Sequence, residues 1–184
     1  MRVYAMLLVG IAVLCGVLVM QLQNMVTPVQ ANTEIYRYFN KKQLTCLHDN
    51  IYHEARNQPI VGQMAVMYVT LNRVDDDRFP DTICEVVMQG PHRPSWKSLT
   101  KLVPIKHKCQ FSWYCDGKSD EVTDQAAYDA VRDMVNEVLM GSVKIFDITE
   151  GATHYHADYV SPSWANTKTK TVEIEDHIFY RWEF

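Results

Sequence analysis

The sequence predicts an α+β fold that is mainly helical, with short β-strands or a hairpin in its C-terminal half. Apolar residues recur at helical spacing between residues 41 and 74, and residues 123–141 form a strongly amphipathic segment. The last forty residues contain β-prone stretches. The chain has 184 residues, of which 47% are hydrophobic. This length suits one domain with a sizeable core.

Two helices begin the predicted domain. The stretch "KKQLTCLHDNIYHEARNQ" places Leu44, Leu47, Ile51 and Ala55 at steps of three, four and four residues, which is one face of a helix. Pro59 ends this helix and suits the first turn of the next one. The following stretch, "PIVGQMAVMYVTLNRV", is apolar nearly all round. We therefore expect a central helix that is buried on most sides.

The middle of the chain has weaker patterns. Pro80 opens a short helix in "PDTICEVVMQ", and Gly90 ends it. Residues 90–108 show no clear period and carry the basic side chains of Arg93, Lys97, Lys101, Lys106 and Lys108. The simpler interpretation is a solvated surface loop, and the alternative is a basic rim for an anionic polymer. The stretch "CQFSWYCDG" is β-prone and ends in Asp-Gly, a turn signal.

The clearest amphipathic helix lies in "TDQAAYDAVRDMVNEVLMG". Its expected buried face consists of Tyr128, Val131, Val135, Val138 and Leu139. Thr123 or Asp124 can cap its start, and Gly141 can end it. Further on, "ATHYHA" and "TVEIEDHIFYRW" have strand character, and the Pro-containing loop "YVSPSW" separates them.

An uncharged apolar segment runs from Val3 to Met20, directly after Arg2. Because this segment nearly spans a bilayer, residues 1–31 are expected to be a secretory signal peptide or an uncleaved membrane anchor. The tripeptide "VQA" allows cleavage after Ala31. Residues 32–40 would then be a linker, and residues 41–184 the folded domain. We expect this domain to be exported, periplasmic or extracellular, and anchored to the cytoplasmic membrane if the segment is uncleaved.

Four cysteines fall in the expected domain: Cys46, Cys84, Cys109 and Cys115. An even set in an oxidising compartment predicts two disulfides. Four cysteines allow three connectivities, and the sequence does not choose among them. The alternative is a zinc site, which the spacing disfavours because it contains no C-x-x-C pair.

The charge composition argues against one class of partner. The chain carries 18 basic and 22 acidic residues, for a net charge of −4. It has neither a dominant basic stripe nor a recognised nucleic-acid-binding motif, so nucleic acid is not an expected partner.

Glu54 is the first candidate catalytic residue. It flanks the apolar stripe of the first helix, close to the helix end. Partial burial against apolar groups would raise its pKa, so that it could act as a general acid. The alternative is a solvated glutamate on the flank of a helix.

Other side chains offer weaker candidates. His154 and His156 alternate in "THYHA" and could bind a metal with His177 or His53, or could be surface or hydrogen-bonded core histidines. Several aromatic side chains could pack in the core or line a sugar-binding cleft: Trp113, Tyr114, Tyr155, Tyr159 and Trp164. Ser112 and the cysteines lack a nucleophile motif, so we do not expect covalent catalysis by serine or cysteine.

The order of motifs resembles the SleB/CwlJ family of cell wall hydrolases. The matching stretches are "IYHEAR", "GQMAVMYVTLNRV", "FPDTICEVV", "CQFS", "GATHYHADYVSPSW" and "HIFYRW". They run in the family's order from about Leu44 to Trp182, across nearly all of the expected domain. One such motif would be weak, whereas the ordered set is specific.

The resemblance implies a lysozyme-like fold that acts on peptidoglycan, as a lytic transglycosylase in the best-understood members, without a metal or cofactor. The family's catalytic glutamate falls on Glu54. The family's substrate-cleft segments fall on Gln110, Phe111, Ser112, His154, Tyr155 and Trp164. The chain departs from the family pattern at Asn57 and Gln58, where Gly-Glu is common, and at Glu175, where a glycine is common.

We therefore expect cleavage of the glycan strand between N-acetylmuramic acid and N-acetylglucosamine. Glycoside hydrolysis normally needs two carboxylates, whereas a lytic transglycosylase can use one and form a 1,6-anhydro product. Asp116 is the best candidate for a second carboxylate, although its place in an Asp-Gly turn explains it structurally. Two other functions stay open: a zinc amidase with His154, His156 and His177 as ligands, and a non-catalytic, membrane-tethered peptidoglycan-binding module.

Overall fold

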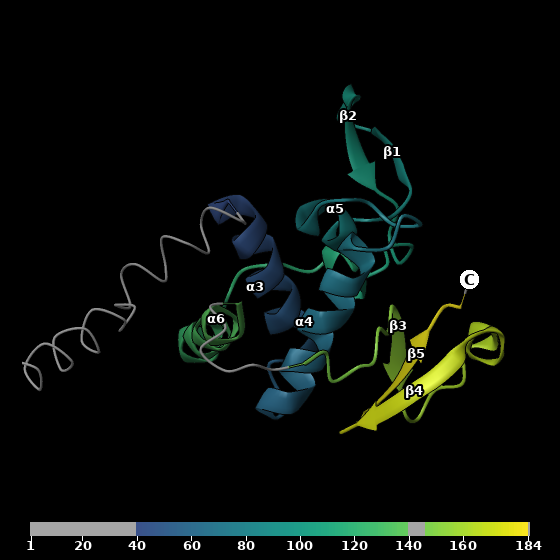
Figure 1. The fold of residues 1–184 in the computed structure, drawn as a ribbon. Helices are drawn as coiled ribbons and strands as arrows, with labels where there is room; N and C mark the ends of the chain where they lie inside the picture. The colour runs from purple at the N-terminus through teal and green to yellow at the C-terminus, as the bar shows by residue number, and fades with distance from the viewer. Residues whose placement is uncertain (1–39, 140–145, 184) are drawn as a thin grey trace, which may run out of the picture.

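The computed structural model describes residues 40–139 and 146–183. The predicted signal peptide or anchor, the linker up to residue 39 and the predicted helix end at Gly141 lie outside the described residues. The helices are α3 (Lys41–Ala55), α4 (Ile60–Val74), α5 (Ile83–Val87) and α6 (Gln125–Leu139). They gather in one part of the molecule, and the C-terminal strands lie beside them (Figure 1). No helix within the described ranges has the length and apolar character to cross a membrane.

Helix α3 forms where the periodicity predicts it. Its start is capped by Asn40, whose side chain accepts a hydrogen bond from the backbone N–H of Gln43 at 3.0 Å. Leu44, Leu47, Ile51 and Ala55 are all buried, as predicted. Leu47, Ile51 and Ala55 belong to the main hydrophobic core, to which α4, α5 and α6 also contribute.

Helix α4 is the central helix that the sequence predicts. Its buried residues lie on most of its circumference: Gly62, Met64, Ala65, Val66, Met67, Val69, Thr70 and Arg73. One side contacts α3, α5 and α6, and the other contacts the C-terminal sheet. The amphipathic helix α6 forms where the sequence predicts it, and Asp124 caps it by accepting from the backbone N–H of Ala127 at 3.0 Å. Of its predicted buried face, Val131 and Val135 are buried, while Tyr128, Val138 and Leu139 are only partly buried.

The C-terminal sheet is antiparallel with the order β3-β5-β4, where β3 is His154–Ala157, β4 is Thr169–Ile174 and β5 is His177–Arg181. A short 3₁₀ helix, η2 (Ser163–Thr167), precedes β4. The turn between β4 and β5 contains Glu175 with φ of 51°, a left-handed conformation that favours glycine. A non-glycine residue in this conformation costs about 1 kcal/mol of strain.

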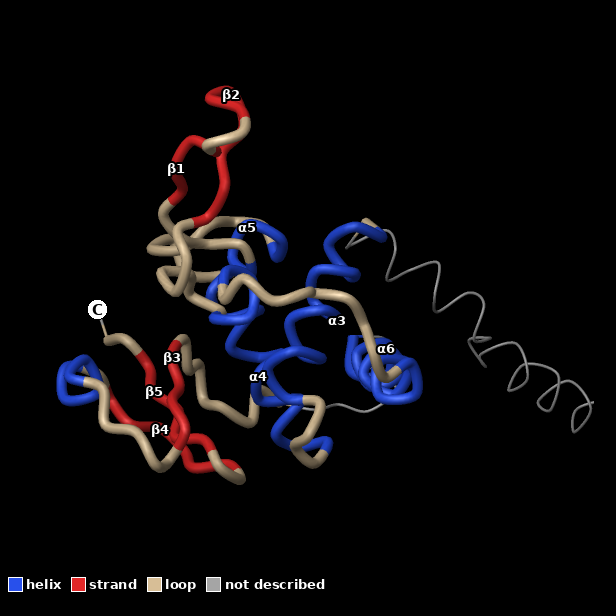
Figure 2. The backbone as a smooth tube through the Cα atoms, turned by 180° about the vertical axis from the view of Figure 1, so that it is seen from behind, coloured by secondary structure: helices blue, strands red, loops and turns tan. Residues whose placement is uncertain are grey.

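Two local predictions are wrong. The segment expected to be a loop contains an antiparallel hairpin, β1 (His92–Ser95) and β2 (Ser98–Pro104). The β-prone stretch after it forms a 3₁₀ helix, η1 (Ser112–Cys115), instead of a strand. Figure 2 shows the hairpin and the C-terminal sheet at different places on the helical part.

The four cysteines form two disulfides, and the structure defines the pairing. Cys46 bonds to Cys84 and links α3 to α5, while Cys109 bonds to Cys115 across six residues of sequence. The second bond closes a tight loop, which explains why the β-prone residues inside it do not extend into a strand.

The two disulfides should differ in their contribution to stability. A cross-link stabilises by restricting the unfolded chain, and the effect grows with loop length. The Cys46–Cys84 loop spans 38 residues and the Cys109–Cys115 loop spans 6. Replacing both cysteines of a pair with alanine should lower the free energy of unfolding by about 4 kcal/mol for the long loop and about 2 kcal/mol for the short one. Urea unfolding of the two double variants measures both losses, and a larger loss for the short loop would contradict the expectation.

The buried imidazole of His48 should make stability depend on pH. Burial, and secondly the charge of Arg132, lower the pKa of His48 from 6.5 to about 4. Between these two values the unfolded chain takes up a proton that the folded chain does not. Stability should therefore fall with decreasing pH, by about 1.4 kcal/mol per pH unit within this window.

His48→Leu removes this titration at a buried position whose Nε2 has no hydrogen-bond partner among the described residues. The variant should lose less stability than the wild type on acidification from neutral pH. Urea unfolding of both proteins across the acidic range provides the comparison. Parallel pH dependences would show that His48 is not the group responsible.

Candidate active site

Glu54 lies in the last turn of α3, one residue before the helix ends at Ala55. Its side chain is partly buried. Its Oε2 accepts a hydrogen bond from the hydroxyl of Tyr155 at 2.7 Å. The two residues are 101 positions apart in the sequence, so the contact joins the first described helix to the C-terminal sheet.

Tyr155 is held by the sheet and by α4. It pairs with Phe179 across β3 and β5, and its ring lies 5.6 Å from that of Phe179 and 5.2 Å from that of His177. Phe179 is fully buried in a second apolar cluster with Ala65 and Val69 of α4. This packing fixes the sheet against α4 and directs the tyrosine hydroxyl at Glu54.

Arg73 is a site residue that the sequence analysis missed. It lies in the last turn of α4 and is only 4% exposed. Its Nε donates to the carbonyl of Thr153 at 2.7 Å, and its guanidinium lies 4.9 Å from the ring centre of Phe111 and 5.4 Å from that of Phe79. Its Nη1 is buried without a hydrogen-bond partner among the described residues. An arginine within an otherwise apolar helix was the signal that could have identified it.

The surroundings of Glu54 set its protonation. Burial is the largest effect and raises the pKa of the Glu54 carboxyl. The hydrogen bond from Tyr155, the charge of Arg73 and a backbone hydrogen bond from Ser112 oppose this rise, in that order. Burial lowers the pKa of Arg73 to about 10, so its guanidinium stays charged at neutral pH. The result is a carboxyl that favours its acid form but has partners that stabilise its carboxylate.

The loop at residues 109–115 holds three predicted substrate-binding residues in different roles. Ser112 is exposed at the start of η1 and lies close enough to bond Glu54 through its backbone. Gln110 is also exposed. Phe111, in contrast, is 1% exposed beneath the guanidinium of Arg73. Phe111 therefore supports Arg73 and presents no surface to a ligand, which corrects its predicted substrate contact.

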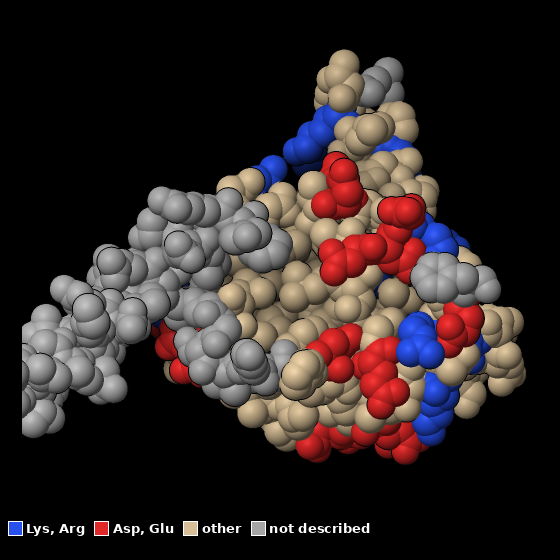
Figure 3. Space-filling model, in the orientation of Figure 1, with Lys and Arg blue, Asp and Glu red and all other residues tan. Residues whose placement is uncertain are grey.

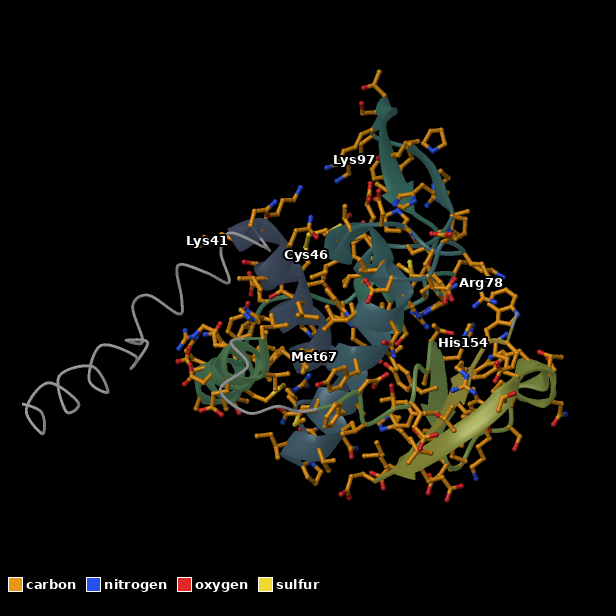
Figure 4. All side chains as sticks on the ribbon, in the orientation of Figure 1. Lys41, Cys46, Met67, Arg78, Lys97 and His154 are labelled. Carbon is orange, nitrogen blue, oxygen red and sulfur yellow. A yellow bond between two sulfur atoms is a disulfide. The ribbon has the colours of Figure 1, made fainter. Side chains whose placement is uncertain are left out.

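His154 lies on the other face of β3 from Tyr155, because neighbouring strand residues alternate. Trp164, in η2, packs against His154 on that face. Their rings are 5.3 Å apart, and Trp182, which the sequence analysis did not select, lies 5.7 Å from His154. Burial, and secondly the charge of Arg73, lower the pKa of His154 to about 3, so its ring is neutral. Figure 4 labels His154 near Arg78 on this side of the molecule. Three predicted residues are thus divided between the Glu54 contact and a separate aromatic cluster.

The structure separates the three histidines of the possible zinc site. His154 and His156 both contact Trp164, whereas His177 contacts Tyr155 on the opposite face of the sheet. Within residues 40–139 and 146–183, no three His, Cys, Asp or Glu side chains are arranged to hold a metal ion. The ligand set expected for a zinc amidase is therefore not assembled.

Asp116 lines a cavity of about 240 Å³ together with His53 and Trp113, whose rings are stacked 4.5 Å apart. Glu54 does not line this cavity. Asp116 Oδ1 accepts from the backbone N–H of Lys118 at 2.7 Å, and this bond is the main cause of its lowered pKa. Asp116 thus stabilises a turn, as its Asp-Gly sequence suggested. Among the residues that the structure describes, none of those that shift the pKa of Glu54 is a carboxylate.

These features define a lysozyme-like α+β domain in which one partly buried acid is held between a helix end and a sheet. A family model described as Cell Wall Hydrolase matches residues 57–180 of this chain. The chain belongs to this cell wall hydrolase family, in agreement with the resemblance to SleB/CwlJ proteins. The matched range begins three residues after Glu54 and does not include it.

The chain is similar to curated spore cortex-lytic enzymes. It is 26% identical over 152 residues to that of Halalkalibacterium halodurans, covering 82% of this chain and 38% of the relative. It is 26% identical over 153 residues to that of Bacillus cereus, covering 83% of this chain and 49% of the relative. The chain thus spans less than half the length of each of these relatives.

Two solved structures share the fold. One is the catalytic domain of the germination-specific lytic transglycosylase SleB from Bacillus anthracis, with a TM-score of 0.54 and 26% identity. The match covers 78% of this chain and 97% of that domain. The other is the catalytic domain of the SleB protein from Bacillus cereus, with the same TM-score and identity, and 92% of that domain covered. The likeness confirms the predicted lysozyme-like α+β fold.

Removing the hydroxyl of Tyr155 should raise the pKa of Glu54 further. The hydrogen bond that it donates favours the carboxylate, and bonds to charged groups are worth about 1.5–3 kcal/mol. Tyr155→Phe keeps the ring packing, so the pKa should rise by about one to two units. An NMR titration of the Glu54 carboxyl measures this shift.

Tyr128→Phe is the matched control, because its hydroxyl donates to another carboxylate, Asp49, at 2.8 Å. This variant should leave the pKa of Glu54 unchanged. A pKa for Glu54 that is unchanged in Tyr155→Phe, or lowered, would show that the hydrogen bond does not set its protonation.

Proposed function

We propose that this domain cleaves the glycan strand of peptidoglycan between N-acetylmuramic acid and N-acetylglucosamine, as a lytic transglycosylase with Glu54 as its single catalytic acid. The observation that carries this proposal is the environment of Glu54: burial raises its pKa, and none of the described residues that act on this pKa is a carboxylate. A one-acid mechanism suits transglycosylation better than hydrolysis, which normally requires a second carboxylate. Membership of the cell wall hydrolase family supports the choice of polymer.

The reaction needs Glu54 in both protonation states. Its acid form donates a proton to the glycosidic oxygen as the bond from C1 of N-acetylmuramic acid breaks. The resulting carboxylate then removes the proton from the C6 hydroxyl of the same sugar, whose oxygen bonds to C1 and closes a 1,6-anhydro ring. Glu54 ends the cycle protonated, and no water is consumed. Tyr155 and Arg73 stabilise the carboxylate that forms midway.

The glycan would contact two surfaces, the exposed loop next to Glu54 and the aromatic cluster on the other face of β3. Ser112 is exposed next to the acid, and Gln110, two residues before it in the same loop, is also exposed. The cluster of His154, Trp164 and Trp182 offers aromatic faces that can stack on sugar rings. Because His154 is neutral, it can bind an uncharged sugar without an added cost of desolvating a charge.

A family that acts on the cell wall works outside the cytoplasm, which agrees with the predicted export of this chain. We further propose that residues 1–31 direct this export and, if they are retained, tether the domain to the cytoplasmic membrane. The tether would hold the enzyme next to the inner surface of the polymer that it cleaves.

Replacing the acid should abolish turnover. General acid–base catalysis contributes about 10²- to 10⁴-fold to rate, so Glu54→Gln should release soluble products at about a thousandth of the wild-type rate or less. Mass spectrometry of products from purified peptidoglycan provides the measurement. Glu137→Gln, at an exposed position on α6, is the matched control and should keep full activity. Undiminished turnover by Glu54→Gln would refute the proposal.

The products identify the reaction. Muropeptides lighter by one water than the hydrolytic ones are 1,6-anhydro species and support transglycosylation. Reducing muropeptides would indicate a hydrolase. Asp116 would then be the first residue to test as its second catalytic carboxylate. Free peptides would indicate an amidase. Binding without soluble products would indicate a non-catalytic module.

A further inference from the structure

The segment of residues 91–108, which we call the basic hairpin, contains β1, β2 and the turn after them. It stands away from the helices (Figure 1). It carries five basic residues, Arg93, Lys97, Lys101, Lys106 and Lys108, and no Asp or Glu, although the chain as a whole has a net charge of −4. Figure 3 shows Lys and Arg side chains in blue along this projection.

Acidic side chains of the described residues do not neutralise these five cations. All five are exposed. None forms an ion pair with an acidic side chain within the parts of the chain that the structure describes. Like charges held together repel one another, so a projecting element with this composition gains stability from an anionic ligand.

The hairpin also presents an aromatic ring. Trp96, in the turn between β1 and β2, is 81% exposed, and Lys97 Nζ lies 5.1 Å from the centre of its ring. Leu102 on β2 is 62% exposed. A tryptophan face next to cations fits a ligand that combines sugar rings with carboxylates.

The hairpin is connected firmly to the site of Glu54. The backbone N–H of Ile105 donates to the carbonyl of Pro91 at 2.9 Å and closes the base of the hairpin. The chain then enters the loop closed by the Cys109–Cys115 disulfide, which contains Ser112. A polymer held by the hairpin would therefore be held at a defined position relative to the acid.

We infer that the basic hairpin is a second peptidoglycan-binding surface outside the Glu54 cleft. Its cations contact the carboxylates of the peptide stems, and Trp96 stacks on a sugar of the glycan. This inference rests on the proposed function, which makes peptidoglycan the substrate. An anionic membrane surface is the competing occupant, but a membrane-inserting element needs a broad apolar face. The hairpin's exposed large apolar side chains, among those that the structure describes, are Trp96 and Leu102.

Sedimentation with insoluble peptidoglycan tests the inference. The Glu54→Gln background keeps the polymer intact during binding. Adding Lys97→Ser and Lys101→Ser should weaken binding about fivefold at low salt, the loss expected for two exposed ion pairs, and less at high salt. Trp96→Ala, made separately, should also weaken it. The matched control is Lys41→Ser with Lys42→Ser, which removes the same charge at the exposed start of α3, far from Lys97 in Figure 4.

Three outcomes would overturn the inference. The first is equal binding by the hairpin and control variants. The second is that the hairpin variant still binds more weakly than the control variant, by the same factor, after the carboxylates of the peptidoglycan have been amidated with carbodiimide. The third is weaker binding of the hairpin variant to phosphatidylglycerol–phosphatidylcholine vesicles but not to peptidoglycan. If the wild type releases no soluble products while hairpin-dependent binding persists, the proposed function fails and this inference stands.

Discussion

The buried guanidinium of Arg73 is the constraint on which the site depends. A buried cation is costly unless hydrogen bonds and opposite charge compensate it. Here the carbonyl of Thr153, the rings of Phe79 and Phe111 and the nearby Glu54 provide that compensation. These partners come from four separate segments of the chain. Placing Arg73 at the end of α4 therefore obliges the end of α3, the disulfide-closed loop and the start of the C-terminal sheet to converge.

Because these segments converge at Glu54, its pKa is subject to two opposing effects. Burial favours the neutral acid, while Arg73, Tyr155 and Ser112 favour the carboxylate. If burial acted alone, the acid would give up its proton only with difficulty, and if the polar partners acted alone, it would be ionised at neutral pH. Their combination suits a group that must donate a proton and then accept one within a single reaction. The site thus supports acid–base chemistry by one carboxyl group.

Local pattern predicted the helices because burial of one face is a local, periodic property. Leu44, Leu47, Ile51 and Ala55 lie on the buried face that their spacing indicates. The same approach failed for residues 92–104, since "HRPSWKSLTKLVP" has no alternation of apolar and polar residues. It also failed for "CQFSWYC", where ring closure by the Cys109–Cys115 disulfide overrides β propensity. Propensity is a weak prior that tertiary constraints can reverse.

The sequence by itself determined the α+β class, the positions of α3, α4, α6 and the C-terminal strands, the presence of two disulfides and the choice of Glu54 as the candidate acid. Only the tertiary structure decided the cysteine pairing, the burial of Phe111, the role of Arg73 and the separation of His177 from His154 and His156. The physical reason is the separation along the sequence over which each interaction acts. Helical periodicity and a single acid beside an apolar stripe are visible within a few turns of chain. The contact between Glu54 and Tyr155 joins residues 101 positions apart, and it depends on the packing of the C-terminal sheet against α4.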